Sequence, residues 1–180
     1  MVALAGLVGV AVALAAFTAS TAGGSAGTAA ARTATAGNDR LSARSWAVYK
    51  RVRTKAKAVN TLAIATFATC SALASKGASA SRLESCLSKS ITAVVTEGKK
   101  VLKVLRGFND EVGGACESSL TKLEGYTKVY VASVNALQTA VGGGGVGGGS
   151  GLESQIDNAR TALVHARAVQ PKFETVCRPK

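Results

Sequence analysis

Four cysteines are the residues of this 180-residue chain best suited to covalent chemistry. Cys70 and Cys86 each lie eight residues from Ala78, inside the turn-forming sequence Lys-Gly-Ala-Ser. Cys116 and Cys177 each lie about thirty residues from the middle of a Gly-rich stretch. Positions equidistant from a turn meet in an antiparallel hairpin. Among the three pairings that four cysteines allow, this spacing therefore favours Cys70–Cys86 and Cys116–Cys177.

The cysteines lie on or beside apolar positions that recur every three or four residues. Buried free thiols would show the same placement and are the alternative to disulfides. The repeat indicates long amphipathic helices packed at shallow angles, as in bundles and coiled coils. We therefore predict an all-α fold, an up-down bundle of about four long amphipathic helices with two disulfides. The helices are expected to begin near Leu41 and then to cover about 81–112, 115–141 and 152–176.

Two local signals indicate where these helices start or break. Asn38 or Asp39 can cap the first helix, because both residue types accept hydrogen bonds from free backbone N–H groups. Pro171 lacks a backbone N–H, so we expect the last helix to kink or end near Gln170.

No catalytic constellation emerges from the remaining reactive residues. The single histidine, His165, has no histidine or carboxylate three or four residues after it, so it does not form a metal site by itself. The close carboxylate pairs Asp110–Glu111 and Glu153–Asp157 fall at expected helix ends, where solvation or the helix dipole explains them. We predict a protein that is not an enzyme and needs no cofactor and no metal.

The charged residues are mostly basic, and the net charge is +12. One cluster surrounds Trp46 and Tyr49, and a second lies in the next predicted helix. The candidate residues for binding an anionic surface are Arg44, Lys50, Arg51, Arg53, Lys55, Lys57, Lys99, Lys103 and Arg106. Cations of this kind bind glycans, anionic lipid or acidic proteins through counterion release and surface potential. The alternative is a solvated helix face that keeps the protein soluble.

The N-terminal residues indicate export. An apolar run over 2–17 is followed by small residues, which predicts a signal peptide over 1–22 and no transmembrane span in the mature chain. A signal anchor is the alternative, because no Lys or Arg precedes the run. We expect a disordered Ala/Thr/Gly-rich tail over 23–40, then a single helical-bundle domain over 41–180 with a flexible Gly-rich loop at 142–151. Export to an oxidising compartment would make the cysteines disulfides.

Two functions fit a secreted, extracellular basic protein of this kind. The first is a non-enzymatic binding or structural role at an anionic surface, or in secretion or gut fluid. The second is that of a secreted inhibitor or a carrier of a small apolar ligand. Nucleic acid is not an expected partner, since a secreted protein meets glycans and lipid first, and the oligomeric state is left open.

The last cysteine belongs to an aromatic-x-x-apolar-Cys ending formed by Phe173, Val176 and Cys177. With a leader, a helical body and four cysteines, the chain from about Val59 to Cys177 resembles secreted insect proteins with a tsetse EP-type domain. The resemblance implies a small extracellular helical protein without an established biochemical activity. The Glu-Pro repeat that names this group is absent here. Plant invertase and pectin methylesterase inhibitors are also secreted bundles with two disulfides, but their first cysteine pair precedes the bundle.

Overall fold

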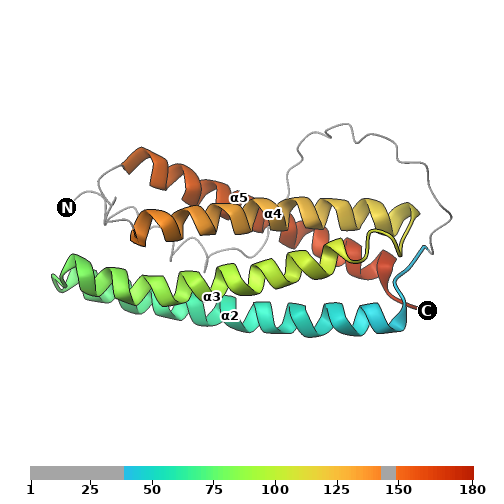
Figure 1. Cartoon of the computed structure of the whole chain (residues 1–180), viewed down its shortest axis with the longest axis horizontal. Helices are drawn as coiled ribbons and strands as arrows, with labels where there is room; N and C mark the ends of the chain where they lie inside the picture. The colour runs from blue at the N-terminus through green and yellow to red at the C-terminus, as the bar shows by residue number, and fades with distance from the viewer. Residues whose placement is uncertain (1–38, 143–148) are drawn as a thin grey trace.

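The computed structural model describes residues 39–142 and 149–180, and this part of the chain forms four long helices. In chain order they are α2 (Ala43–Ser75), α3 (Ala80–Arg106), α4 (Gly114–Gly142) and α5 (Gly149–Cys177). Helices α2 and α3 pack as one antiparallel pair, α4 and α5 as another, and α3 packs on α4 (Figure 1). The predicted all-α up-down bundle is confirmed.

The first helix starts at Ala43, close to the predicted Leu41, but its cap is Ser42 rather than Asn38 or Asp39. The backbone N–H of Ser45 donates to the Ser42 Oγ at 3.1 Å, as in a helix N-cap. Glu111, in the α3–α4 connection, accepts hydrogen bonds of 2.6 Å from the Ser42 backbone N–H and the Ser45 hydroxyl. A carboxylate at the positive end of a helix dipole is favourable, so Glu111 fixes the start of α2.

The turn between α2 and α3 is the one predicted from the sequence. Gly77 has a φ of +75°, a left-handed conformation that glycine adopts without steric cost. The backbone N–H of Ala78 donates to the carbonyl of Leu73 at 3.1 Å, which closes the end of α2.

Two other helix boundaries differ from the prediction. Helix α3 ends at Arg106 instead of Val112, because a series of turns starts at Gly107. Phe108 and Val112 are nevertheless buried, so these apolar residues continue the core without continuing the helix. Helix α5 begins at Gly149, inside the predicted loop 142–151.

Of the two outcomes predicted for Pro171, a kink or an end near Gln170, the end does not occur, since α5 continues to Cys177. A proline inside a helix costs about 3 kcal/mol through a lost hydrogen bond and a clash. Beyond it, Phe173 and Cys177 are completely buried. Burial of one Phe contributes about 1.5–3 kcal/mol, and a disulfide adds a comparable amount, so the packing of the last turn offsets the proline.

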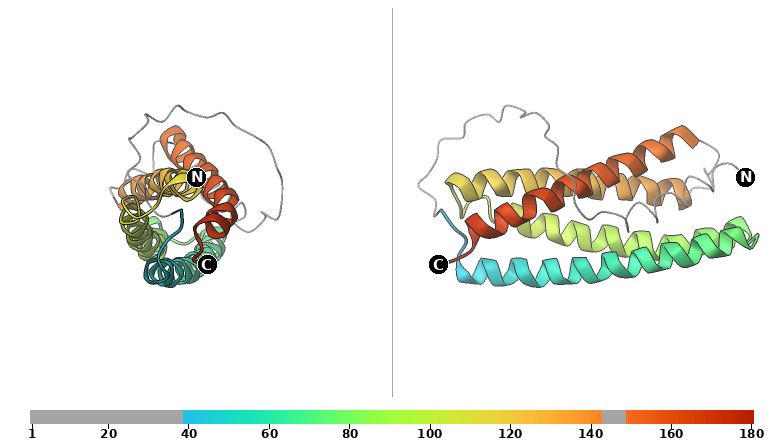
Figure 2. Two further views of the ribbon diagram at one scale, coloured as in Figure 1. Left: turned by 90° about the vertical axis from the view of Figure 1, so that its right-hand side faces the viewer. Right: turned by 180° about the vertical axis from the view of Figure 1, so that it is seen from behind.

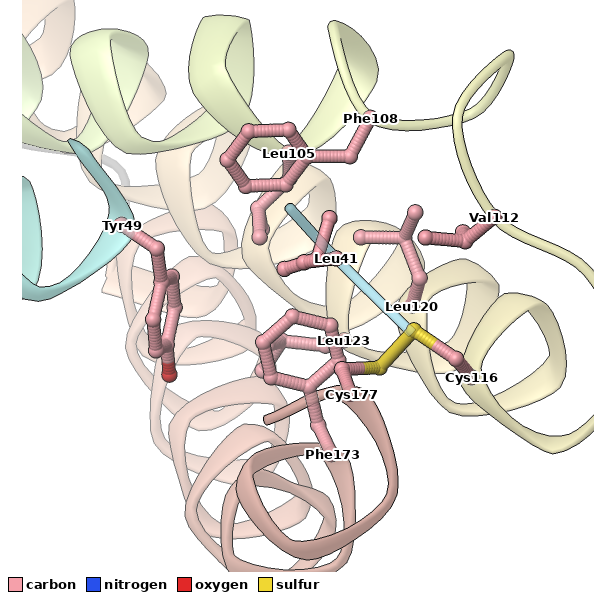
Figure 3. Close-up of a cluster of buried hydrophobic side chains, with 10 residues drawn as sticks. All are labelled: Leu41, Tyr49, Leu105, Phe108, Val112, Cys116, Leu120, Leu123, Phe173 and Cys177. Carbon is pink, nitrogen blue, oxygen red and sulfur yellow. A yellow bond between two sulfur atoms is a disulfide. The ribbon is translucent and has the colours of Figure 1, made fainter. Parts of the chain in front are cut away.

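Both predicted disulfides are present, one near each end of the bundle. Cys70–Cys86 joins the end of α2 to the start of α3 beside a cluster of buried Ala, Leu, Ile and Val side chains. Cys116–Cys177 joins the start of α4 to the end of α5 within the second cluster, beside Phe173 and Leu120 (Figure 3). Each antiparallel helix pair is therefore closed by one covalent link.

One side of the bundle is open. Helix α5 crosses α4 obliquely, so its N-terminal half rises away from α2 (Figure 2). The backbones of α2 and α5 do not approach each other closely. Those of α2 and α3, of α3 and α4, and of α4 and α5 do. At the opposite end, the backbone N–H of Leu41 donates to the carbonyl of Cys177 at 3.0 Å, which brings the start and the end of the bundle together.

The predicted signal peptide over 1–22, most of the predicted tail over 23–40 and the centre of the Gly-rich loop lie outside the described residues. These three features stay predictions. At the border of the tail, the Arg40 Nη1 donates to the carbonyl of Arg178 at 2.9 Å.

Candidate ligand cavity and basic surfaces

All nine basic residues predicted to bind an anionic surface are exposed, but they lie on three separate helix faces. On α2, the spacing i, i+3, i+7 places Lys50, Arg53 and Lys57 on one face. The Arg53 Nη1 lies 3.1 Å from the Glu174 Oε1 of α5, so this face borders α5.

The second basic face of α2 consists of Arg44, Arg51 and Lys55, at i, i+7 and i+11. In the described ranges none of these three side chains has a carboxylate within ion-pair distance. The basic cluster predicted on the first helix is therefore divided between two faces.

The third face lies on α3 and consists of Lys99, Lys103 and Arg106. The Arg106 Nε lies 3.1 Å from the Glu124 Oε1 of α4, so this face is turned toward α4. It does not join the Lys50–Arg53–Lys57 face, which borders α5 on another side of the bundle.

A cavity of about 400 Å³ lies between the four helices. Its wall is mainly aliphatic and includes Val59, Val94, Val101, Leu123, Leu163 and Ala166. Of these, Val94 and Leu123 are buried, which places them in the interior of the bundle. Pockets that bind small molecules are typically about 300–1,000 Å³, mainly apolar, with a few polar groups.

The cationic side chains that line the cavity are solvent-exposed and therefore mark its opening. Arg53 and Lys57 come from α2, and Arg167 comes from α5. These are the two helices that lack a close backbone approach. The opening therefore lies on the α2–α5 side.

Tyr130 supplies a polar group deeper in the cavity. Its hydroxyl lies 3.5 Å from the Asn60 Oδ1, which joins α4 to α2 across the bundle. Burial raises the pKa of Tyr130 to about 12, although the nearby charge of Arg167 acts in the opposite direction. Tyr130 is thus a neutral hydrogen-bonding group at physiological pH.

Glu97 is the carboxylate that the described chain contributes to the cavity lining. Its Oε1 pairs with the Lys100 Nζ at 2.5 Å, one turn along α3. Its Oε2 is buried and has no hydrogen-bond partner in the described structure. A buried acceptor without a donor costs free energy, so a donor that reached this oxygen would be stabilising.

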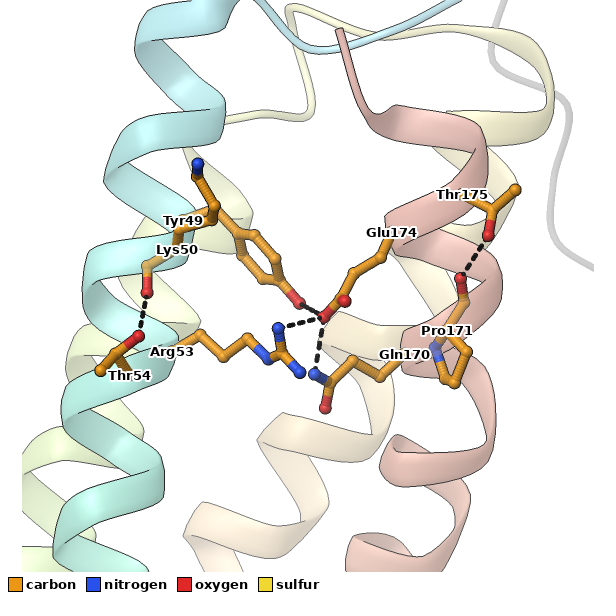
Figure 4. A network of polar contacts seen from close by, with 8 residues as sticks. All are labelled: Tyr49, Lys50, Arg53, Thr54, Gln170, Pro171, Glu174 and Thr175. Atoms are coloured by element: carbon orange, nitrogen blue, oxygen red, sulfur yellow. Dashed lines mark hydrogen bonds and ion pairs between the residues drawn. The ribbon is translucent and has the colours of Figure 1, made fainter.

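Glu174 joins α2 and α5 at the end of the cavity (Figure 4). Its Oε1 accepts hydrogen bonds from the Tyr49 hydroxyl at 3.0 Å and the Gln170 Nε2 at 2.7 Å, besides the ion pair with Arg53. Burial, followed by the charge and the hydrogen bond of Glu174, raises the pKa of Tyr49. Tyr49 is buried against Phe173 and so belongs to the core, not to the basic surface around it.

His165 has a packing role. Its ring stacks on Tyr126 with the ring centroids 4.9 Å apart, and both side chains are half-buried. Within residues 39–142 and 149–180, no group of three or more histidines, cysteines or carboxylates could hold a metal ion. None of the helices described above is long and apolar enough to cross a membrane.

The sequence offered an apolar-ligand carrier as an alternative function, but of the residues that line the cavity only Arg53 and Lys57 were predicted site residues. Ala56, Gly98 and Ala166 line its wall with small residues; Val131 fills the side-chain position of Gly98, so Ala56 and Ala166 leave the space. All three sit among the apolar positions of their helices, where small residues equally indicate close packing. In the sequence, the cavity is indicated only by small residues at apolar positions of three helices. Whether these residues lie at the same height in the bundle depends on the register between the helices.

No protein-family model matches this chain, and no curated protein and no solved structure matches it. The resemblance to tsetse EP-type proteins therefore stays a prediction.

Proposed function

We propose that this protein is an extracellular, non-enzymatic binding protein that holds a small, largely apolar ligand between its four helices. The observation that carries this proposal is the aliphatic cavity of about 400 Å³, which opens between α2 and α5. An aliphatic surface binds apolar molecules because about 25 cal/mol is gained for each Å² removed from water.

The cysteines support both the location and the binding role. Two disulfides and no free cysteine indicate an oxidising compartment, which agrees with the predicted signal peptide. Since every cysteine is bonded, none is a free nucleophile.

Titration with N-phenylnaphthylamine, a neutral apolar fluorophore, tests the proposal. We expect saturable binding of about one molecule per chain. Ala56→Leu fills part of the cavity and should weaken binding about tenfold or more. Ala58→Leu is the matched control, because Ala58 is exposed on the same helix and does not line the cavity. Absence of saturable binding, or equal binding by both variants, would refute the proposal.

A second function, attachment to an anionic glycan, lipid surface or acidic protein, is supported by the Arg44–Arg51–Lys55 face. Exposed cations without carboxylate partners are available to such a surface. Binding to immobilised heparin should fall steeply with salt and weaken when these three residues are changed to Gln. Binding that does not respond to salt would remove this second function.

A further inference from the structure

We propose that the ligand of the cavity is a single-chain carboxylate, a free fatty acid, with its carboxylate at the α2–α5 opening. This inference rests on the proposed binding function and specifies its ligand. It combines two features of the same cavity: an aliphatic interior, and an opening lined by Arg53, Lys57 and Arg167.

The charges at the opening favour an anion. Arg53 shares Glu174 with Tyr49 and Gln170, so its charge is partly compensated. Lys57 and Arg167 have no carboxylate within ion-pair distance in the part of the chain that the structure describes. A carboxylate offers acceptors to both side chains, and charge-assisted hydrogen bonds are stronger than neutral ones.

The distribution of polar groups favours a ligand with one charged end. Lys57 and Arg167 are exposed, while Val94 and Leu123 in the interior are buried. A molecule with a carboxylate at one end and a hydrocarbon chain at the other matches this gradient from opening to interior. A uniformly polar anion would leave the aliphatic wall without a partner.

Glu97 is the charge in the lining that opposes an anion. Its Oε1 is paired with Lys100, and it projects from α3, whereas the cations project from α2 and α5. Its unpartnered Oε2 would instead favour an amine, which makes a cationic amphiphile the competing ligand. The two cations without a carboxylate partner, Lys57 and Arg167, outweigh this compensated carboxylate and favour the anion.

Displacement of N-phenylnaphthylamine by three ligands with the same hydrocarbon chain tests this inference. The ligands are dodecanoate, methyl dodecanoate and undecylamine; the acid and the amine are kept below their micelle concentrations and the ester below its solubility limit. We expect dodecanoate to displace the probe at a concentration about tenfold or more below that of the ester, and the amine to be the weakest. Decanoate is two CH₂ groups shorter than dodecanoate. The concentration that displaces the probe should rise about fourfold for each CH₂ group lost.

The double variant Lys57→Gln/Arg167→Gln should remove the advantage of dodecanoate over the ester and leave displacement by the ester unchanged. Arg51→Gln/Lys55→Gln is the matched control, since it removes the same charge from residues that do not line the cavity. Equal displacement by acid and ester, stronger displacement by the amine, or equal loss in the control would overturn the inference. If the probe itself does not bind, the proposed function fails first, so the two failures are distinguishable.

Discussion

The hydroxyl of Tyr49 donates a 3.0 Å hydrogen bond to the Glu174 Oε1, across the one side of the bundle where neighbouring helices lack a close backbone approach. Tyr49 belongs to α2, and Glu174 belongs to the last turn of α5. This side chain contact therefore holds α2 to α5 where the backbones do not.

Tyr49→Phe should lower the free energy of unfolding by about 1–2 kcal/mol, because a partly buried hydrogen bond to a carboxylate is lost. Chemical denaturation with urea measures the change. Tyr126→Phe is the control, since the Tyr126 ring stacks on His165 and its hydroxyl makes no hydrogen bond among the described residues. Equal losses in the two variants would contradict a specific role for the Tyr49 hydroxyl.

Glu111→Gln should destabilise the protein by about 1 kcal/mol at neutral pH, because it removes the charge at the start of α2. Partial burial alone raises the pKa of Glu111, but hydrogen bonds from Ser45 and Ser42 outweigh it and leave the pKa below 4.5. A lowered folded-state pKa means that this stabilisation is present above pH 4.5 and is lost as the pH falls through the folded value.

Denaturation curves at neutral pH and well below pH 4.5 measure this pH dependence. Wild type and Glu111→Gln should differ at neutral pH and converge in acid. Asp110→Asn is the control, because Asp110 is exposed and makes no hydrogen bond to α2. A difference that persists unchanged in acid would show that Glu111 acts through its shape and not through its charge.

Gly98→Ala should destabilise the α3–α4 contact by about 1–3 kcal/mol. A Cβ at Gly98 would lie 2.6 Å from the Val131 Cγ2, and valine has little rotamer freedom in a helix. Gly125→Ala should instead stabilise by about 0.5–1 kcal/mol, since its Cβ would meet nothing within 4 Å. Val131→Ala combined with Gly98→Ala should recover part of the stability lost in Gly98→Ala. Thermal unfolding of wild type, the two glycine variants and this double variant tests these expectations.

Cys70–Cys86 should be reduced before Cys116–Cys177 by a mild thiol without denaturant. Cys86 is half-buried, whereas both Cys116 and Cys177 are completely buried. Alkylation followed by mass spectrometry identifies the thiols released first. The paired cysteines are separated by 16 and 61 positions along the chain, so loop entropy gives about 3 and about 4 kcal/mol of stabilisation. Earlier release of Cys116 would contradict the prediction.

The helices and the disulfides could be predicted from the sequence because both depend on spacing along the chain. The apolar repeat identified four helices, and the equal distances of Cys70 and Cys86 from Ala78 identified their pairing. Glycine marked the first turn for a local reason, because Gly77 adopts a positive φ.

Features that depend on contacts between distant segments were missed. Ser42 caps α2 because Glu111, 69 residues away, contacts it there. Pro171 stays helical because Phe173 and Cys177 are buried beyond it. Spacing along α2 already divides its basic residues between two faces. Which helix each basic face borders depends on helix rotation, which Arg53 and Arg106 reveal only through their partners Glu174 and Glu124.

The hydrogen bond between Leu41 and Cys177 places the start of α2 and the end of α5 at the same pole of an elongated molecule (Figure 1). The turn between α2 and α3 lies at the other pole. A protein fused after Lys180, or a surface to which Lys180 is attached, would therefore sit beside the start of α2. Such an attachment would present the Cys70–Cys86 pole to the solution and keep the long sides of the molecule accessible.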